Sequence, residues 1–530
     1  MSNKNLLKLI IFIAIVARFV ALDYAPPHLS NDEIGAAYAA YSISKTSKDA
    51  SGEFLPVLWK SHGGYGSPLA VYIPMISIII MGNSDFAVRL PSAILGSLTI
   101  ILLGFLVKEL TKNSNLALTS SFLLAISPWH FSASRWALES NYALFFVVLG
   151  IFLFFFGINR NKFWLVVLSF ISFAFSIYSY YTEWILTPLI ILALLFRYNR
   201  FFLERKARSF LVFLFFLILL VPICLSFVRT FNSSRAVSEL ITKDVAVSRL
   251  LVEEKNSLGK LQVVLRAFFD KYSSYLSLDY LFFYGADILP KENPYQFGFF
   301  LFPFFIPFIY GLFRLKTFYS RNSDLVYLLL FISPLIASFT EGSLNNWRSL
   351  PELLPVALIS GVGVLSIWSV VKEKLFIKVF VFVLLLINFF YFFLIYFRHF
   401  PLQKAVNYQY GFKQIALFIN GHYNEYEKIV IDRRFGDKNY YYIGVPSSYI
   451  PFYTSLDPHK VQNAKFLTNG IAFDKYEFRD INWESEKIRN GYLYVLPYDI
   501  VPDPKYGLNL VYEIRLPNWQ PAFRLYVKED

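Results

Sequence analysis

The stretch Ser30-Asn31-Asp32-Glu33 follows the first hydrophobic segment of the chain, in a loop that opens with Pro26-Pro27. Two adjacent carboxylates beside an apolar segment are unusual, because burying charge near lipid is costly. The pair therefore indicates a loop at the mouth of a membrane bundle, and it suggests that these acids have a functional role.

The composition around this stretch is typical of a membrane protein. The chain has 530 residues, of which 56% are hydrophobic and 16% charged, and its mean hydropathy is +0.47. The net charge of +13 could suggest a nucleic-acid partner, but Lys and Arg gather in short clusters between apolar runs. Such clusters mark cytoplasmic loops, whereas nucleic-acid binding needs a continuous basic face. We therefore expect membrane lipids, and no nucleic acid, as partners.

Two features bear on disulfide formation and on cleavage of a signal peptide. Cys224 is the single cysteine, so no intramolecular disulfide forms. Lys4 and Lys8 precede the first apolar run as in a signal peptide, but Arg18 interrupts the run and no small-residue cleavage site follows. The sequence predicts an uncleaved first span.

Apolar runs of near-span length alternate with loops, and the basic loops orient them. The pattern predicts about eleven transmembrane helices, with the N-terminus inside and the C-terminus outside. The expected spans are 6–22, 86–107, 116–128, 142–158, 163–180, 184–196, 210–228, 297–313, 325–339, 351–371 and 375–396.

Two outer loops are long. In the first, 23–85, the apolar run 69–81 is short for a span and predicts a juxtamembrane helix near the surface. In the second, 229–296, apolar residues recur at helical spacing over 258–272. This helix either lies in the membrane interface or packs on the outer domain.

The composition changes after Arg398, where charged and turn residues become common. We expect a transmembrane module over 1–397 and an extracytoplasmic α/β domain over 398–530, large enough for a modest core. The predicted helix is 411–422, and the predicted strands are 428–432, 440–445, 492–496, 510–516 and 523–527. The fold class is thus a polytopic α-helical membrane protein with a C-terminal soluble α/β domain.

The acidic pair has two compatible interpretations. Asn31 or Asp32 could cap a helix over 34–44, since acids are favourable in a first helical turn. Asp32 and Glu33 could also act on a substrate, because a carboxylate can serve as a general base. Spacing alone leaves both open.

A second carboxylate, Glu139, faces the same predicted side. Arg135 lies four residues before it, so the two could pair along a helix. Glu139 could instead be a partner acid or a ligand of a divalent metal. His62 and His130 are scattered and give only a weak metal pattern, so the metal question stays open.

Outer arginines could hold a phosphate. Arg348 stands at a helix entrance beside Trp347, and Arg89 lies in Phe86-Ala87-Val88-Arg89-Leu90-Pro91-Ser92. A guanidinium suits bidentate phosphate binding, and it is also a common interfacial anchor.

These motifs occur in an order that resembles a known family. Along the chain they are Asp32-Glu33, Gly66-Ser67-Pro68-Leu69 with Tyr72, Gly82, the segment around Arg89, Ser127-Pro128-Trp129-His130, Ser134-Arg135 and Glu139. Together they resemble the GT-C superfamily of polyprenyl-phosphate-sugar-dependent glycosyltransferases, in particular relatives of protein O-mannosyltransferase and lipid A aminoarabinose transferase. The motifs cover about residues 28–142, and the span layout extends the resemblance to about residue 396.

The resemblance implies an inverting transfer of a hexosyl or pentosyl group on the outer face of the plasma membrane. The donor would be a sugar on an undecaprenyl or dolichyl phosphate, and the acceptor a protein, a lipid or a cell-envelope glycan. Asp32, with Glu33 beside it, would be the base, Glu139 the second acid, and Arg89, Arg348 and Arg135 carrier-phosphate ligands. Relatives commonly show Lys-Pro-Pro-Leu where this chain has Gly66-Ser67-Pro68-Leu69, so Lys60 is the substitute phosphate ligand.

Two other function classes compete. A transporter or flippase for lipid-linked glycans would fit a polytopic protein, but such proteins often show repeated halves, which this sequence lacks. A membrane scaffold would leave the clustered outer acids without a role. The sequence therefore favours the transferase.

Overall fold

The computed structural model describes residues 3–61, 64–231, 237, 239–286, 297–319, 322–371, 374–437, 440–483 and 485–528. The chain divides into two compact units. The first comprises Met1–Val20, Gly63–Ala70 and Leu90–Leu394, and the second Ala21–His62, Val71–Arg89 and Ile395–Asp530. The loop that carries Asp32 thus folds together with the C-terminal part of the chain.

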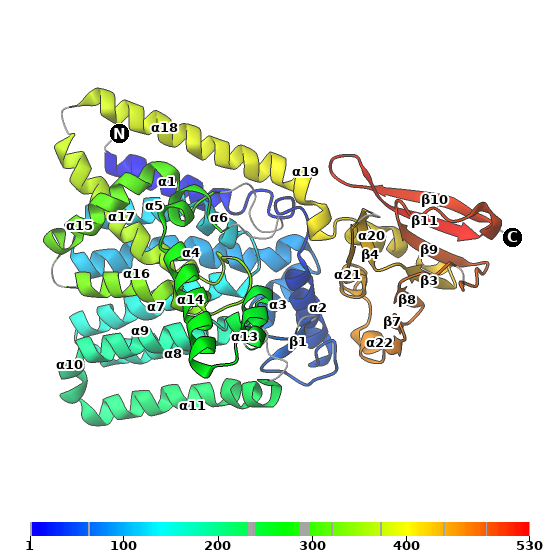
Figure 1. The fold of residues 1–530 in the computed structure, drawn as a ribbon, viewed down its shortest axis with the longest axis horizontal. Helices are drawn as coiled ribbons and strands as arrows, with labels where there is room; N and C mark the ends of the chain where they lie inside the picture. Colours follow the sequence, from blue (N-terminus) through cyan, green and yellow to red (C-terminus); the bar gives the residue numbers. More distant parts are fainter. Residues whose placement is uncertain are drawn as a thin grey trace. The chain divides into compact units, whose positions relative to one another are not determined.

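The first unit is a bundle of apolar helices, several of which run side by side (Figure 1). Its longer helices, of which α4 begins in the second unit, are α1 (Asn3–Ala17), α4 (Asp85–Thr111), α5 (Ser114–Ala125), α7 (Glu139–Asn159), α8 (Phe163–Ser179), α9 (Glu183–Arg197), α11 (Lys206–Thr230), α14 (Ser257–Tyr275), α15 (Phe305–Phe318), α16 (Ser323–Ser338), α17 (Leu353–Val370) and α18 (Leu375–Leu394). The shorter ones are α6 (Pro128–Ser134), α10 (Asn199–Leu203) and α13 (Val245–Glu253).

Each predicted span overlaps one of these helices. Among the described residues, five helices are long and apolar enough to cross a membrane, and other apolar helices are shorter. The long ones are Asp85–Thr111, Glu139–Asn159, Lys206–Thr230, Leu350–Val370 and Leu375–Lys404. The prediction of a polytopic helical membrane protein is therefore confirmed.

Small residues let the helices approach closely, as is common in membrane bundles. A Cβ added at Gly150 of α7 would lie 2.5 Å from the Phe173 ring of α8. A Cβ added at Gly363 of α17 would lie 1.7 Å from the carbonyl oxygen of Pro307 in α15. These two helix pairs can pack as they do only because glycine occupies the crossing points.

Several predicted span boundaries differ from the helix ends, among them the end of the first span and the start of the span at 297. The first helix ends at Ala17 rather than at residue 22, because the carbonyl groups that follow bind the Arg135 side chain instead of continuing the helix. α15 begins at Phe305 rather than at residue 297. The apolar run before it includes Pro303, which stands in a short 3-10 turn, so apolarity alone misplaced the start.

Helix α14 confirms the predicted helix in the second long loop. Phe268 is buried and stacks on Phe339 with ring centroids 4.3 Å apart, and the Tyr272 hydroxyl donates to the Phe331 carbonyl at 2.9 Å. Leu258 and Phe269, in contrast, remain exposed. One face of α14 therefore packs on α16, while apolar residues on the other face remain exposed. The expected partner for packing was the outer domain, whereas the observed partner is a helix of the bundle.

The second unit combines helices from the N-terminal and C-terminal parts of the chain with the C-terminal sheet. The helices are α2 (Asn31–Thr46), α19 (Phe400–Lys404), α20 (Phe412–His422), α21 (Pro446–Tyr453) and α22 (Pro458–Gln462), while α3 (Leu69–Met81) is shared with the first unit. The second unit also contains the short strand β1 (Trp59–Ser61) and the antiparallel pair β4 (Arg434–Asp437) and β5 (Tyr440–Ile443). The short strand β2 (Gly64–Gly66) belongs to the first unit. Helix α3 confirms the predicted helix over 69–81.

The C-terminal sheet has seven strands in the order β10-β11-β9-β3-β8-β7-β6. β3 is parallel to β8 and β9, and the remaining pairs are antiparallel. The strands are β3 (Lys428–Ile431), β6 (Lys465–Leu467), β7 (Gly470–Phe473), β8 (Tyr476–Arg479), β9 (Tyr492–Pro497), β10 (Leu508–Arg515) and β11 (Pro521–Lys528). The predicted α20, β3, β5, β9, β10 and β11 are present, whereas β4, β6, β7 and β8 were missed.

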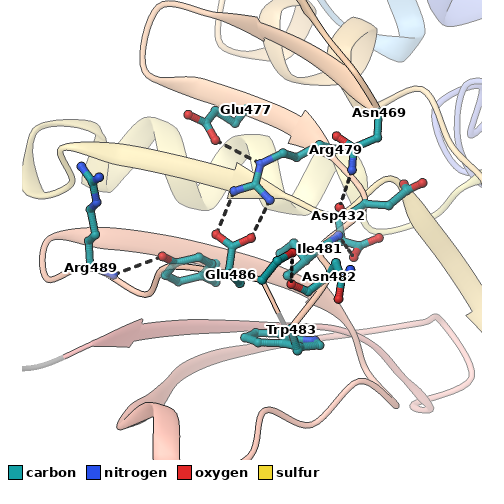
Figure 2. A network of polar contacts seen from close by, with 12 residues as sticks. Asp432, Asn469, Glu477, Arg479, Ile481, Asn482, Trp483, Glu486 and Arg489 are labelled. Carbon is teal, nitrogen blue, oxygen red and sulfur yellow. Dashed lines mark hydrogen bonds and ion pairs between the residues drawn. The ribbon is translucent and has the colours of Figure 1, made fainter.

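Charged residues along the sheet pair with one another (Figure 2). Arg479 donates to both oxygens of Glu486 at 2.7 and 2.8 Å, and its Nε donates to Glu477 at 3.1 Å. The fully buried Asp432 accepts the Ile481 N–H at 3.1 Å, which joins the ends of β3 and β8. A bidentate guanidinium–carboxylate pair fixes geometry as well as charge, so this network stabilises the sheet.

Candidate functional site

Ser30 caps helix α2 and fixes the acidic pair. The Ser30 hydroxyl accepts the Glu33 N–H at 3.3 Å, and the Ser30 N–H donates to Glu33 Oε2 at 2.9 Å. This reciprocal arrangement is a capping box. The prediction that Asn31 or Asp32 caps the helix is therefore wrong, because both lie inside it. Asp32 is exposed in the first turn, where the helix dipole favours a carboxylate.

Glu33 and Arg89 form a fully buried ion pair. Arg89 Nε lies 2.8 Å from Glu33 Oε1, and Nη2 lies 3.0 Å from Oε2. The remaining donors bind carbonyls of the loop: Nη1 those of Leu22 and Pro26 at 3.1 and 2.9 Å, and Nη2 that of His28 at 2.5 Å. A guanidinium has five N–H donors, and all five are used here. These contacts favour a positioning role for both residues over the catalytic and phosphate-binding roles expected from the sequence.

A second buried carboxylate, Asp85, ties the start of α4 to the C-terminal helices. It accepts the Tyr453 hydroxyl at 2.5 Å and pairs with Lys413 at 3.0 Å. The Asn83 amide adds a bond to the Phe452 carbonyl at 2.7 Å. Because Asp85 is 1% exposed, its charge depends on these partners.

His28 lies at the centre of this packing. Its ring stacks on Tyr449 at 4.9 Å, and Nδ1 contacts the Tyr408 carbonyl at 3.1 Å. Burial lowers the pKa of His28 to about 4, although the charge of Asp85 acts in the opposite direction. The Tyr449 hydroxyl donates to the Leu29 carbonyl at 2.5 Å, directly before the capping box. The histidine is therefore neutral near pH 7 and forms part of the core.

C-terminal residues also hold the body of α2. The Gln462 amide donates to the Ser42 and Thr46 hydroxyls at 3.1 and 2.9 Å. The Tyr41 hydroxyl donates to the Ser455 carbonyl at 2.9 Å. The helix that carries Asp32 is thus held at its cap and along its length by the C-terminal part of the chain.

In the first unit, Arg348 lies in a separate polar cluster. Its Nη2 pairs with Glu239 Oε2 at 2.7 Å, and its Nη1 donates to the Glu341 carbonyl at 3.2 Å. The Tyr181 hydroxyl donates to the same Glu239 oxygen at 2.5 Å. The charges of Arg348, Glu239 and Glu139 all act on the neighbouring hydroxyl of Tyr180. Two predicted site residues, Glu139 and Arg348, therefore lie within electrostatic reach of one tyrosine.

Arg135 is fully buried and closes the end of α1. Its Nη1 donates to the carbonyls of Ala17, Arg18 and Val20 at 3.0, 3.0 and 2.7 Å. A cation at a helix C-terminus is favourable, so these contacts support a structural role. Arg18 is buried beside it and bonds His130 Nδ1 at 3.0 Å.

Two residues predicted from the sequence remain, Lys60 and His62. Lys60 is exposed in β1, and His62 lies outside the described residues. Within the part of the chain that the structure describes, no three His, Cys, Asp or Glu side chains come together as metal ligands. Sequence reasoning missed Glu239, Tyr181, Lys413 and Tyr453, which lie far along the chain from the residues they bind and follow no local motif.

Comparisons with known proteins agree with this architecture. The family model for dolichyl-phosphate-mannose-protein mannosyltransferase matches residues 65–225. The structure of ArnT from Cupriavidus metallidurans in the apo state is 12% identical, with a TM-score of 0.56, and the match covers 99% of this chain and 98% of ArnT. ArnT from the same organism bound to undecaprenyl phosphate is 14% identical, with a TM-score of 0.58 and the same coverage. No curated protein sequence matches the chain at a significant level. The resemblance to the GT-C superfamily is therefore confirmed, and the chain has the ArnT-like GT-C fold.

Proposed function

We propose that the protein is an inverting glycosyltransferase that moves a sugar from a polyprenyl-phosphate carrier to an acceptor outside the plasma membrane. An acceptor atom attacks the anomeric carbon, the bond from that carbon to the carrier phosphate breaks, and the phosphate leaves with the lipid. The acceptor's proton goes to a carboxylate. The family model and the fold shared with ArnT, including ArnT bound to undecaprenyl phosphate, support this chemistry.

The observation that carries the proposal is the setting of Asp32. It is exposed at the N-terminal end of α2, while the neighbouring Glu33 is fully buried and held by Arg89 and Ser30. A catalytic group works best when its support is rigid and its reactive atoms are reachable. We assign Asp32 as the base and Glu33 as a positioning residue.

Arg348 is the arginine that we assign to the carrier phosphate. Arg89 and Arg135 each donate to three backbone carbonyls, whereas Arg348 stands beside the hydroxyls of Tyr180 and Tyr181. Guanidinium and hydroxyl donors together suit a phosphate. Glu139, near Tyr180, is the candidate second acid.

The proposal is tested by following bond cleavage in proteoliposomes that contain the full chain. Polyprenyl phosphates that carry different labelled sugars are supplied with peptide, lipid and glycan acceptors. We expect label on one acceptor class, with inverted anomeric configuration and release of the carrier phosphate. If the sugar stays on the carrier and only changes leaflet, the protein is a flippase and the proposal is wrong.

A further inference from the structure

We propose that Glu239 is an internal stand-in for the carrier phosphate, which displaces its carboxylate from Arg348 and Tyr181 on binding. This inference rests on the proposed function and extends it to the state without a ligand. It assigns a role to a residue in the long second loop, for which the sequence predicts none.

The first argument is the convergence of donors on one oxygen. Arg348 Nη2 and the Tyr181 hydroxyl both donate to Glu239 Oε2, at 2.7 and 2.5 Å. Charged groups in such short contacts form strong hydrogen bonds. An oxygen of a phosphate can take both bonds in the same way, so the carboxylate marks an anion position.

The second argument is that the carboxylate does not use the whole guanidinium. Arg348 Nε is buried and has no hydrogen-bond partner among the described residues. A buried donor that is left unsatisfied is destabilising. A phosphate offers several oxygens and can occupy Nε and Nη2 together, as bidentate arginine–phosphate pairs do. The site therefore fits a phosphate better than it fits Glu239.

The third argument is charge. Lys271 lies close enough to Arg348 for the two cations to act on each other, and its Nζ donates to the Thr340 carbonyl at 2.7 Å. Its carboxylate neighbour, Asp244, is at a distance of 3.7 Å. Asp244 partly balances the charge of Lys271. When Glu239 swings away, the charge of Arg348 loses its carboxylate partner, which favours the binding of another anion.

The exchange does not require the backbone to move. The Glu341 N–H donates to the Glu239 carbonyl at 2.8 Å, and the Ile241 N–H donates to the Phe339 carbonyl at 2.7 Å. These two backbone hydrogen bonds hold the loop in place beside the site. The Glu239 side chain, in contrast, is 24% exposed. Rotation of that side chain toward solvent frees Arg348 and leaves the two backbone hydrogen bonds intact.

The opposite interpretation is that Glu239 orients Arg348 for the phosphate. The two interpretations predict opposite changes in carrier affinity when Glu239 is removed. A stand-in competes with the ligand, so its removal tightens binding, whereas an orienting partner supports the ligand site, so its removal weakens binding.

The test is the affinity of the full-length protein, in detergent, for a short-chain polyprenyl monophosphate. Glu239→Gln removes the charge and keeps the size, and we expect its Kd to fall about tenfold. Glu239→Ala should change Kd in the same direction. Arg348→Ala should weaken binding, and the matched control Asp270→Asn, an exposed acid on α14, should match the wild type. The corresponding polyprenol, which lacks phosphate, should not respond to Glu239.

Weaker or unchanged binding by folded Glu239→Gln overturns the inference, as does tighter binding of the polyprenol to the same extent. If the wild type binds the carrier and transfers sugar while Glu239→Gln does not bind more tightly, only this inference fails. If neither the wild type nor Glu239→Gln binds the carrier, the inference and the proposed function fail together. A thermal unfolding midpoint confirms that each variant is folded.

Discussion

Arg89 and Glu33 lie 56 residues apart in the chain and form a 2.8 Å ion pair from which solvent is fully excluded. The pair connects α4 to the capping box of α2, and Arg89 also binds three carbonyls of the loop that precedes α2. The acidic stretch that the sequence marks is therefore divided between an exposed residue, Asp32, and a buried one that holds it in place.

Breaking this pair should destabilise the protein strongly. Arg89→Leu leaves Glu33 charged and buried, and Glu33→Gln leaves Arg89 uncompensated, so each should cost about 3–5 kcal/mol of unfolding free energy. The double variant should cost less than the sum of the two, because neither charge is then left alone. Thermal or denaturant unfolding in detergent measures this. If Arg89→Leu unfolds like the wild type and loses only carrier affinity, Arg89 is a phosphate ligand and not a positioning residue.

Stability should fall as the pH drops from about 6.5 to about 4, in part because of His28. Its folded pKa, about 4, lies below the ordinary value of 6.5, because burial disfavours the charged ring. Between these values the unfolded chain binds a proton that the folded chain does not, so stability decreases with falling pH. The full effect is about 3 kcal/mol. His28→Asn keeps a donor for the Tyr408 carbonyl and should flatten the profile. Equal pH slopes for the variant and the wild type would contradict this assignment.

Two glycine substitutions should have opposite effects. Gly363→Ala places a Cβ 1.7 Å from the backbone oxygen of Pro307, which cannot move without shifting α15, so it should destabilise by at least about 1–3 kcal/mol. Gly421→Ala, in α20, meets nothing within 4 Å and should stabilise by about 0.5–1 kcal/mol through helix propensity. Unfolding midpoints of both variants provide the comparison. A neutral Gly363→Ala would show that α15 and α17 are not closely packed there.

The proposed orientation predicts which side of the membrane the C-terminal sheet occupies. In a Cys224→Ser background, Tyr440→Cys should react with an impermeant thiol reagent added outside intact cells, because the basic clusters place the inner loops in the cytoplasm. The matched control is a cysteine at Arg205, in the most basic predicted inner loop, which should react only after permeabilisation. Labelling of residue 440 only from the cytoplasmic side would reverse the orientation.

Local pattern was enough to predict the long apolar helices and most strands of the seven-stranded sheet. Hydrophobic length located the spans, and turn residues located β9, β10 and β11. β6, β7 and β8 were missed because they are three or four residues long and separated by tight turns, which leaves too little alternation to detect. The end of α1 was misplaced because Arg135, far along the chain, binds its last carbonyls.

Local pattern also indicated only part of the candidate site. Asp32, Glu139 and Arg348 were singled out by residue type and loop position. The residues that bind such side chains are distant in the sequence. Tyr453 lies 368 residues from Asp85, and Glu239 lies 109 residues from Arg348. Such contacts depend on the tertiary fold, and a single sequence carries no pattern that links them.

The central claim, that Asp32 is the base in a transfer from a polyprenyl-phosphate carrier, is tested most directly by the turnover of Asp32→Asn beside its carrier affinity. The amide keeps the size of the side chain but cannot accept the acceptor's proton. We therefore expect kcat to fall about 10²–10⁴-fold, while the carrier Kd stays unchanged and Asp23→Asn, an exposed acid in the same loop, behaves like the wild type. Transfer by Asp32→Asn at the wild-type rate would contradict the account.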